Sequence, residues 1–553
     1  MSDLALPPWL RGPRWWALLT LGLALGFSAV TVTRLPDMTL VPLAAGWLFL
    51  ARRWRWGAPP PPEPPARVWP WSLVPLILWG IYVFLADRFG IVDLGAVFFH
   101  LQAGISEHGG GRLVVAALFT LAMLLVLAAF TWLVRVDFRW RRRERLLAVA
   151  LLVGNPLLID LGQRGAAIVT EDGAWLDRQY VAPVIREAPP TPPNLLIFYL
   201  ESLERTYANR ERFGDAYAPL AALGERGVVF EGVRQLDNTG WTMAGMIASQ
   251  CGTPLMPAGL LHDRQFEPLE RVVPGVTCLG DLLDARGYAL SYLGGASTRF
   301  AGKGRFYTDH GFDRVRGRET LAPRLDDPDY LNSWGLFDDS LYGFVEEEVR
   351  RLEAEGGPWG LVSLSLGTHP PNGFPARACR ERQGEFDGVD ILYSVECSAW
   401  LVSRLVRRLE AEGLLEDTLV VIASDHLSMR VSAWDRLIAG PRANTFMLIG
   451  NDLPPRRIRV EASTMDVLPT VLEAMGFSLD RHRAGLGVSL FAGAPTLVEE
   501  HGLETLNARL KEETALQERL WQGVDIRPPF PPAEIPPPRS TAAPGAPGTA
   551  SAD

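Results

Sequence analysis

The uneven distribution of apolar residues constrains this chain more than any other feature. Residues 1–162 contain five long apolar runs, whereas most Asp, Glu and His residues follow residue 170. A bilayer core of ~30 Å needs about 20 apolar residues per helix, so we expect a transmembrane bundle of about five helices. A cleavable signal peptide accounts for the first run only, because four more follow it. The expected spans are residues 15–32, 38–51, 69–85, 113–134 and 146–161, of which the second and fifth are short.

Arginine residues cluster in three of the segments that flank these runs. Because Lys and Arg concentrate in cytoplasmic loops, five spans that begin inside place all three clusters in the cytoplasm and the C-terminal part outside. Four spans leave that large polar part inside, and we therefore favour five. The clusters are Arg11 and Arg14; Arg52, Arg53 and Arg55; and Arg135, Arg139, Arg141, Arg142, Arg143 and Arg145.

The rest of the chain divides by composition. Residues 163–193 end in a proline-rich run and are interpreted as a linker. Residues 194–523 form the expected catalytic domain, and residues 524–553 form a Pro/Ala-rich tail that we expect to be disordered. The net charge of −9 argues against a nucleic-acid partner, because nucleic-acid phosphates require a basic surface.

All four cysteines lie in the expected external domain, at positions 251, 278, 379 and 397. An even number on the oxidising side of a membrane predicts two disulfides. Four cysteines allow three pairings, and proximity along the chain favours Cys251 with Cys278 and Cys379 with Cys397. The alternative interpretation is four buried, reduced thiols.

The domain is predicted to have an α/β architecture with a mostly parallel central sheet. Short apolar runs, typical of buried parallel strands, alternate with amphipathic helical segments. Strands are expected at 195–200, 228–233, 290–293, 361–366, 419–423 and 445–449, and helices include 340–355, 398–412 and 465–475.

Polar residues follow three of these strands. Glu201 comes after the first, His369 after the fourth, and Asp425 and His426 after the fifth. Ligands bind beyond the carboxyl ends of parallel strands, and Asp, Glu and His together make a metal site. Taken alone, none of these residues predicts a metal site. A single carboxylate such as Glu201 after a strand often caps the next helix instead. Their shared position is what predicts the site.

Five sequence blocks resemble the alkaline phosphatase/sulfatase superfamily. More narrowly, they are similar to phosphoglycerol transferases of osmoregulated periplasmic glucans and to their lipoteichoic acid synthase relatives. This resemblance covers roughly residues 190–490 and implies a bacterial inner-membrane protein whose catalytic domain faces the periplasm. The blocks are NLLIFYLESLERTY (194–207), GWTMAGMIASQCGTP (240–254), RFAGKGRFYTDHGFD (299–313), NSWGLFDD (332–339) and ASDHLSM (423–429).

The resemblance implies a metal site and a nucleophile. Glu201, Asp425 and His426 match the family's metal ligands, and Thr242 matches the nucleophilic threonine, whose oxygen also binds the metal. A cation on an alcohol oxygen lowers its pKa and polarises phosphoryl oxygens. Oxygen ligands with one imidazole suit Mn²⁺ or Mg²⁺, with Zn²⁺ as the alternative.

Two more residues resemble substrate groups. Lys303 stands where lipoteichoic acid synthases carry an arginine, and is expected to hold phosphate oxygens; the alternative is a solvated surface charge. His369 resembles the family's active-site histidine; the alternative is a hydrogen-bonded loop residue. The synthases' histidine and tryptophan align with Gly294 and Ala301 here, which favours the glucan-modifying branch.

The expected activity is therefore transfer of phosphoglycerol from phosphatidylglycerol to a periplasmic glucan through a phospho-threonine. The main alternative is a phosphoethanolamine transferase, although such enzymes usually carry more histidines than the eight found here. A lipoteichoic acid synthase-like polymerase and a non-catalytic envelope protein are further alternatives. A sulfatase is not expected, because Cys251 lacks the Cys-x-Pro-x-Arg pattern.

Overall fold

The computed structural model describes residues 173–257, 271–382, 390–450 and 452–523, with isolated positions between 78 and 162. The five predicted spans, apart from those isolated positions, and the predicted disordered tail lie outside the described residues. Within the described part, no helix is both long and apolar enough to cross a bilayer.

An eight-stranded sheet forms the centre of the domain, in the order β10-β3-β9-β8-β2-β7-β5-β6. Within it, only β9 runs against its neighbours β8 and β3, so the prediction of a mostly parallel sheet is confirmed. The strands are β2 (Asn194–Leu200), β3 (Val228–Phe230), β5 (Ala289–Gly294), β6 (Arg314–Arg316), β7 (Trp359–Leu364), β8 (Thr418–Ser424), β9 (Phe446–Ile449) and β10 (Arg456–Ile458).

Two predicted strands differ from the expectation. The strand predicted at 445–449 as parallel is the antiparallel β9, and the connection before it includes the short helix α16 (Trp434–Leu437). The chain returns to the edge where β8 ends, because the backbone N–H of Ser424 donates to the carbonyl oxygen of Thr445 at 2.9 Å, so the next strand runs back against β8. The strand predicted at 228–233 ends at Phe230, and the chain resumes as β4 (Val233–Arg234) in a separate two-stranded sheet with β11 (Ala462–Ser463).

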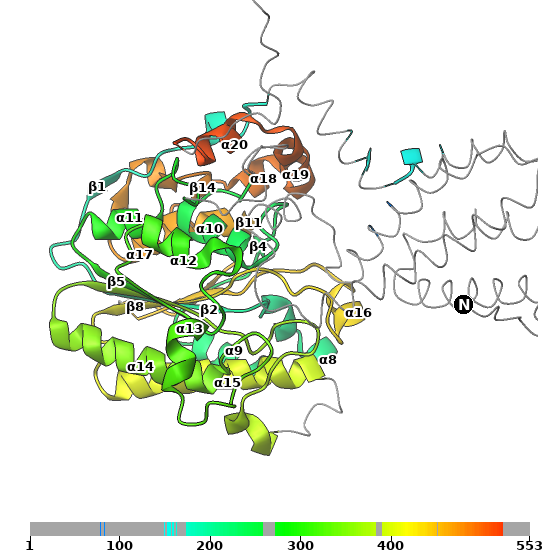
Figure 1. Ribbon diagram of the computed structural model, residues 1–553. Coiled ribbons are helices and arrows are strands. Elements are labelled where there is room, and N and C mark those ends of the chain that lie inside the picture. The colour runs from blue at the N-terminus through cyan, green and yellow to red at the C-terminus, as the bar shows by residue number, and fades with distance from the viewer. Residues whose placement is uncertain are drawn as a thin grey trace, which may run out of the picture.

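Helices cover both faces of the central sheet (Figure 1). In β2, Leu195, Ile197 and Tyr199 face one hydrophobic core, while the alternate residues face the other. Burial on both faces explains why this strand is apolar at nearly every position. One layer contains α10 (Thr242–Cys251), α11 (Leu279–Asp284), α12 (Lys303–Asp309), α17 (Val467–Ala474), α18 (Leu497–His501), α19 (Leu503–Glu512) and α20 (Ala515–Leu520); the other contains α9 (Ala218–Gly224), α14 (Asp338–Glu355) and α15 (Asp390–Ala411).

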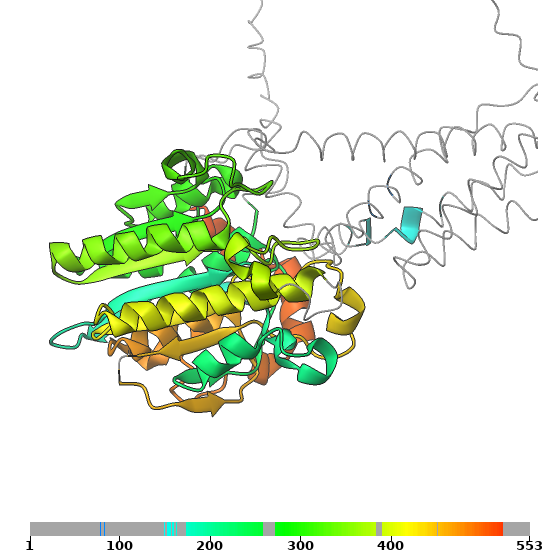
Figure 2. The same cartoon turned by 90° about the horizontal axis from the view of Figure 1, so that it is seen from below.

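The two long helices α14 and α15 lie side by side across one face of the sheet, as Figure 2 shows. Both run against the parallel strands, so both begin at the edge where those strands end. Shorter elements complete the domain: α8 (Arg210–Phe213), α13 (Arg318–Leu321), β1 (Ile185–Glu187), β12 (Ser478–Leu479), β13 (Arg483–Ala484) and β14 (Gly487–Val488).

Much of the predicted linker 163–193 lies along the domain. Its β1 pairs with β12, the backbone N–H of Leu176 donates to Glu513 at 2.7 Å, and Asp177 pairs with Arg519 at 2.6 Å. Leu176 is buried, so an apolar anchor holds this segment although its end is proline-rich. Residues 173–193 are therefore part of the folded unit.

Two disulfides fix the positions of loops and helices. Cys251–Cys278 joins the end of α10 to the residue before α11, and Cys379–Cys397 joins the loop after β7 to α15. These are the pairs that proximity along the chain favours. The first restrains the end of the helix that carries Thr242, and the second restrains the loop that carries His369.

Candidate active site

The residues predicted at strand ends meet at one edge of the sheet. Strands β8, β2 and β7 are parallel neighbours, so their carboxyl ends lie together. Glu201 follows β2 directly, Asp425 and His426 follow β8, and His369 follows β7 after a short turn. The topology of the sheet, rather than proximity in sequence, brings them together.

Glu201, Asp425 and His426 form a compact buried cluster. One ligand atom from each lies within 4.8 Å of the others. His426 Nε2 is 3.3 Å from Glu201 Oε1 and 3.4 Å from Asp425 Oδ2. The backbone N–H groups of Ser202 and His426 donate to Asp425 Oδ1, at 2.8 and 2.9 Å. Backbone donors thus hold one carboxylate oxygen and leave the other directed at the cluster.

The donor atoms of this cluster fit a divalent cation. Among the described residues, Asp425 Oδ2 and His426 Nε2 have no hydrogen-bond partner although they are buried. A buried polar atom without a partner costs about 1–3 kcal/mol, and coordination of a cation removes that cost. The two carboxylates and the imidazole are the ligand types that such ions use in proteins.

The pKa values in the cluster reflect two buried carboxyl groups held close together. Burial raises the pKa of Asp425 to about 7, and the negative charge of Glu201 adds to the effect. Burial alone lowers the pKa of His426, but the carboxylates of Asp425 and Glu201 outweigh it and raise that pKa to about 9. For Glu201, burial is outweighed by the nearby imidazole of His426 and the charge of His369, which lower its pKa. A positive charge, on His426 or on a bound cation, therefore stabilises the two ionised carboxylates of this cluster.

Thr242 is the first residue of α10 and points its hydroxyl at the cluster. Its Oγ1 donates to Glu201 Oε2 at 3.4 Å. Thr242 is partly exposed, whereas the next nine residues of α10 are buried. The N-terminus of a helix carries partial positive charge that favours an anion. The hydroxyl therefore lies where a phosphate and the cluster can both reach it.

Gly245 allows α10 to approach the loop that carries Asp425. A Cβ atom at Gly245 would lie 1.7 Å from the carbonyl oxygen of Asp425. That oxygen belongs to the backbone, so a side chain there must push the helix and the loop apart. Only glycine at this position allows α10, which carries Thr242, to pack this closely against the backbone of Asp425.

Gly245→Ala is expected to destabilise the domain by about 1–3 kcal/mol through overpacking, and to weaken the binding of Mn²⁺. Calorimetric titration of Mn²⁺ and the thermal midpoint measure the two effects. Gly343→Ala in α14 is the matched control, because a Cβ there meets nothing within 4 Å. The control should be neutral or stabilise by up to ~1 kcal/mol; equal behaviour of the two variants would contradict the close-approach argument.

Lys303 is buried, with 2% of its surface exposed, and opens α12. Ala301 and Gly302 before it have positive φ values of 55° and 72°, which turn the chain inward. Its ammonium group lies over the ring of Phe300, 4.9 Å from the ring centroid. Burial lowers the pKa of Lys303 to about 8, while the charges of Glu201 and Asp425 act in the opposite direction. The alternative of a solvated surface lysine is therefore wrong.

His369 lies at the edge of the cluster and is partly exposed. Its Nδ1 is 2.8 Å from the carbonyl oxygen of Pro370, and its ring centroid is 4.4 Å from that of Trp334. The neighbouring Thr368 donates its hydroxyl proton to the carbonyl oxygen of Glu201. The hydrogen bond of Thr368 thus ties the loop that carries His369 to the end of β2. The His369 ring packs against Trp334, a residue that the sequence pattern did not indicate.

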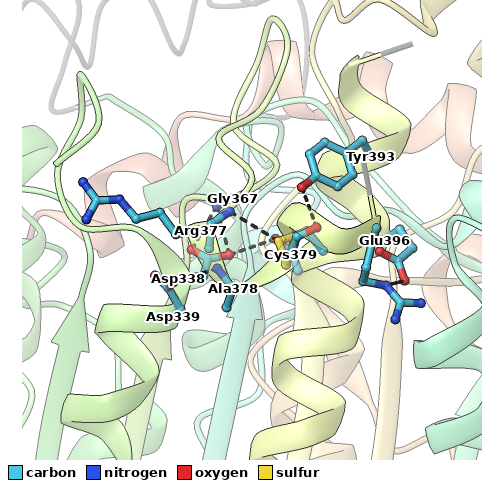
Figure 3. Close-up of a disulfide and its surroundings, with 12 residues drawn as sticks. Asp338, Asp339, Gly367, Arg377, Ala378, Cys379, Tyr393 and Glu396 are labelled. Carbon is cyan, nitrogen blue, oxygen red and sulfur yellow. Dashed lines mark hydrogen bonds and ion pairs between the residues drawn. A yellow bond between two sulfur atoms is a disulfide. The ribbon is translucent and has the colours of Figure 1, made fainter. Parts of the chain in front are cut away.

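Asp338 was also not singled out, although it belongs to the NSWGLFDD block. This fully buried carboxylate accepts hydrogen bonds from the backbone N–H groups of Leu366 and Gly367, at 2.8 and 3.0 Å, and from the hydroxyl of Ser398, at 2.8 Å. Burial raises its pKa to about 6. Asp338 therefore holds the start of the His369 loop against α14 and α15. Figure 3 shows Asp338, Gly367 and the nearby disulfide.

Asp338→Asn is expected to lower the free energy of unfolding by about 1–3 kcal/mol, because the amide nitrogen cannot accept these hydrogen bonds. The thermal midpoint and the rate of proteolysis in the loop after β7 measure this. Glu347→Gln, at an exposed ion pair of the same helix, is the control and should change the midpoint little. A similar midpoint for both variants would show that Asp338 does not hold the loop.

Comparisons with known proteins identify the family of this chain. The Sulfatase family matches residues 193–477, which is just over half of the chain. Phosphoglycerol transferase I of Escherichia coli O127:H6 is 32% identical over 480 residues, covering 82% of this chain and 60% of that protein. The Shigella flexneri protein of the same name is 31% identical with the same coverage. The chain thus spans about 60% of the length of these relatives.

A protein in the alkaline phosphatase superfamily from Vibrio parahaemolyticus aligns with a TM-score of 0.45 and 19% identity, over 57% of this chain and 74% of that one. The match to the family covers the whole central sheet and every residue of the cluster at the strand ends. The chain therefore belongs to the sulfatase family.

Proposed function

We propose that this chain is a membrane-anchored phosphoglycerol transferase that moves phosphoglycerol from phosphatidylglycerol to a periplasmic glucan. The observation that carries the proposal is the hydroxyl of Thr242, 3.4 Å from Glu201, at a helix N-terminus beside the buried cluster. The similarity to proteins named phosphoglycerol transferase I supports the choice of donor. Buried Lys303 supports it too, because it places a cation near the same cluster.

The proposed cofactor is one divalent cation, Mn²⁺ or Mg²⁺. Glu201, Thr242, Asp425 and His426 would hold it, since their oxygen and imidazole donors suit these ions. When bound, the cation lowers the pKa of an alcohol oxygen and neutralises charge on a phosphoryl group.

The proposed reaction proceeds in two steps. In the first, Thr242 Oγ1 releases its proton to solvent and attacks the phosphorus of phosphatidylglycerol, the bond from phosphorus to the diacylglycerol oxygen breaks, and a glycerophosphoryl-threonine forms. In the second, a sugar hydroxyl attacks the same phosphorus, and the threonine oxygen leaves and regains a proton from solvent. Lys303 holds the non-bridging oxygens, while His369 gives a proton to the leaving diacylglycerol and later takes one from the sugar.

The proposed location is the bacterial inner membrane, with the domain facing the periplasm. Five apolar runs and their arginine flanks support this topology. The two disulfides suit an oxidising compartment. An anchor also confines the active site beside a lipid donor that stays in the bilayer.

Labelled lipids test the proposal. Membranes containing the chain are incubated with phosphatidylglycerol or phosphatidylethanolamine labelled in the head group. Label is expected in a water-soluble glycan from the glycerol lipid alone, with release of diacylglycerol. Transfer from the ethanolamine lipid alone would reject the proposal and establish the phosphoethanolamine alternative.

A further inference from the structure

A cleft of about 370 Å³ lies at the same edge of the sheet as the active site. Three segments line it: the loop before α14, the loop after β7 and the first turn of α15. Its lining includes Asp329, Tyr330, Phe337, Arg377, Arg380 and Tyr393. Its volume falls in the ~300–1,000 Å³ range of ligand sites.

Two of these segments also carry residues of the active site. The loop after β7 contributes His369 to the active site and Arg377 and Arg380 to the cleft. In the loop before α14, Leu331 and Leu336 pair as a β-bridge, with Trp334 between them packing on His369 at 4.4 Å. A ligand in the cleft is therefore bounded by the same two loops that position the His369 and Trp334 rings.

One wall of the cleft is a rigid stack. The ring of Tyr330 packs on Phe337 with centroids 4.5 Å apart, and the guanidinium of Arg377 lies 4.0 Å from the centroid of Tyr330. The Tyr330 hydroxyl donates to Asp339 at 3.0 Å, and Arg377 pairs with Asp327 at 2.6 Å. These contacts fix the wall before any ligand arrives, which reduces the entropy cost of binding.

The opposite wall is held by the disulfide Cys379–Cys397. The Tyr393 hydroxyl donates to the carbonyl oxygen of Cys379 at 2.7 Å, and the backbone N–H of Ala376 donates to Cys397 Sγ at 3.3 Å. Figure 3 shows Arg377 and Tyr393 on opposite sides of Cys379. The second disulfide thus stabilises this cleft, whereas the first stabilises the nucleophile helix.

The polar groups of the cleft select the class of ligand. Arg380 is exposed, and among the described residues no carboxylate pairs with it. Asp329 is exposed as well and supplies an acceptor. Sugar hydroxyls both donate and accept hydrogen bonds, so they can use the guanidinium and the carboxylate together. A phosphate would be repelled by Asp329, and an acyl chain has no group that can hydrogen-bond to either charged residue.

We propose that the cleft is a carbohydrate subsite that binds the acceptor glucan beside the sugar unit that reacts. This inference rests on the proposed function, because it assigns the acceptor of that reaction. Arg380 and Asp329 bind hydroxyls of a neighbouring sugar unit, and the fixed aromatic rings shape the space around it. The acceptor chain then extends from His369 along the loop after β7.

Equilibrium binding to the full chain in detergent tests the subsite. The chain carries Thr242→Ala to prevent turnover, and the probes are glucose and its β-linked disaccharide and tetrasaccharide. We expect the tetrasaccharide to bind more tightly than glucose, and Arg380→Ala to raise its Kd about tenfold or more, as loss of a charged hydrogen bond predicts. Arg404→Ala, an exposed arginine of α15 outside the cleft, is the matched control and should leave the Kd unchanged.

Three outcomes would overturn the subsite. They are no binding of the tetrasaccharide, an equal Kd for the Arg380 and Arg404 variants, and preferential binding of glycerol 3-phosphate that Arg380→Ala abolishes. Release of diacylglycerol from phosphatidylglycerol by the wild-type chain is measured separately. That release tests the proposed function alone, so failure of the subsite and failure of the transferase are distinguishable.

Discussion

Thr242→Ala is expected to reduce the release of diacylglycerol from phosphatidylglycerol by roughly 10⁴-fold or more, the scale on which loss of a nucleophile slows an enzyme. The expected cause is chemical, because the hydroxyl makes a long hydrogen bond to Glu201, at 3.4 Å, that contributes little to stability. Thr242 is partly exposed at the start of α10, so removal of its oxygen leaves no cavity in the core. The thermal midpoint of the variant should therefore equal that of the wild type within a degree or two.

Two further variants separate nucleophilic attack from other roles of this threonine. Thr242→Ser keeps a hydroxyl and should retain measurable turnover. Thr308→Ala removes an exposed hydroxyl from α12, which donates to the carbonyl of Gly304, and should leave the rate unchanged. Mass spectrometry of the wild type, quenched with phosphatidylglycerol but without acceptor, should find a glycerophosphoryl group on the peptide that contains Thr242. Diacylglycerol release by Thr242→Ala at the wild-type rate would remove Thr242 from the mechanism.

The sequence predicts the centre of the fold well for a physical reason. Strands β2, β7 and β8 are buried on both faces, so each is an almost uninterrupted apolar run. A polar residue directly after such a run marks the strand end, and parallel strands end at one edge. Glu201, Asp425 and His426 were therefore predicted to meet from local pattern alone, and the structure brings them within 4.8 Å.

Features that depend on long-range contacts were not predictable in this way. The direction of β9 follows from the connection after β8, and an apolar run of four residues carries no sign of direction. Asp338 binds Leu366, Gly367 and Ser398, which lie 28 to 60 residues away, so no spacing rule indicates its role. The 173–193 segment reads as a linker from its prolines, yet Leu176 and Asp177 bind residues more than 300 positions later.

Lys303→Met is expected to have opposite effects on activity and stability. The ammonium group is buried near Glu201 and Asp425, and burial lowers its pKa from 10.5 to about 8. Loss of a preorganised cation that binds the phosphate should slow the release of diacylglycerol by roughly 10²–10³-fold. The same substitution removes a buried charge, and a fall in pKa of this size corresponds to a gain of about 3 kcal/mol in the free energy of unfolding at pH 7.

The pH dependence of stability checks the sign of this effect. Below pH 8 the folded wild type carries a buried charge, and the full cost of its burial is present. Between pH 8 and 10.5 the folded protein loses this proton while the unfolded chain keeps it, so stability rises with pH. Above 10.5 both states are neutral and the rise ends. Lys303→Met lacks this rise, and its thermal midpoint at pH 7, measured with a chelator present, should exceed that of the wild type by several degrees.

The pH dependence of activity distinguishes a phosphate-binding lysine from one that is merely buried. If the ammonium holds the phosphate, the rate constant kcat/KM for phosphatidylglycerol falls as Lys303 loses its proton, at or below about pH 8, because a bound cation offsets the charges of Glu201 and Asp425 that raise this pKa. Lys303→Arg keeps the charge, because a guanidinium stays protonated throughout this range. The falling limb should then move to higher pH, and the residual rate at pH 7 should exceed that of Lys303→Met. If Lys303 has only a structural role, both variants should lose activity only as far as they lose stability. The falling limb of the pH profile should then stay at the wild-type pH. The two substitutions therefore divide the contribution of Lys303 into its charge, which binds the substrate, and its burial, which costs stability.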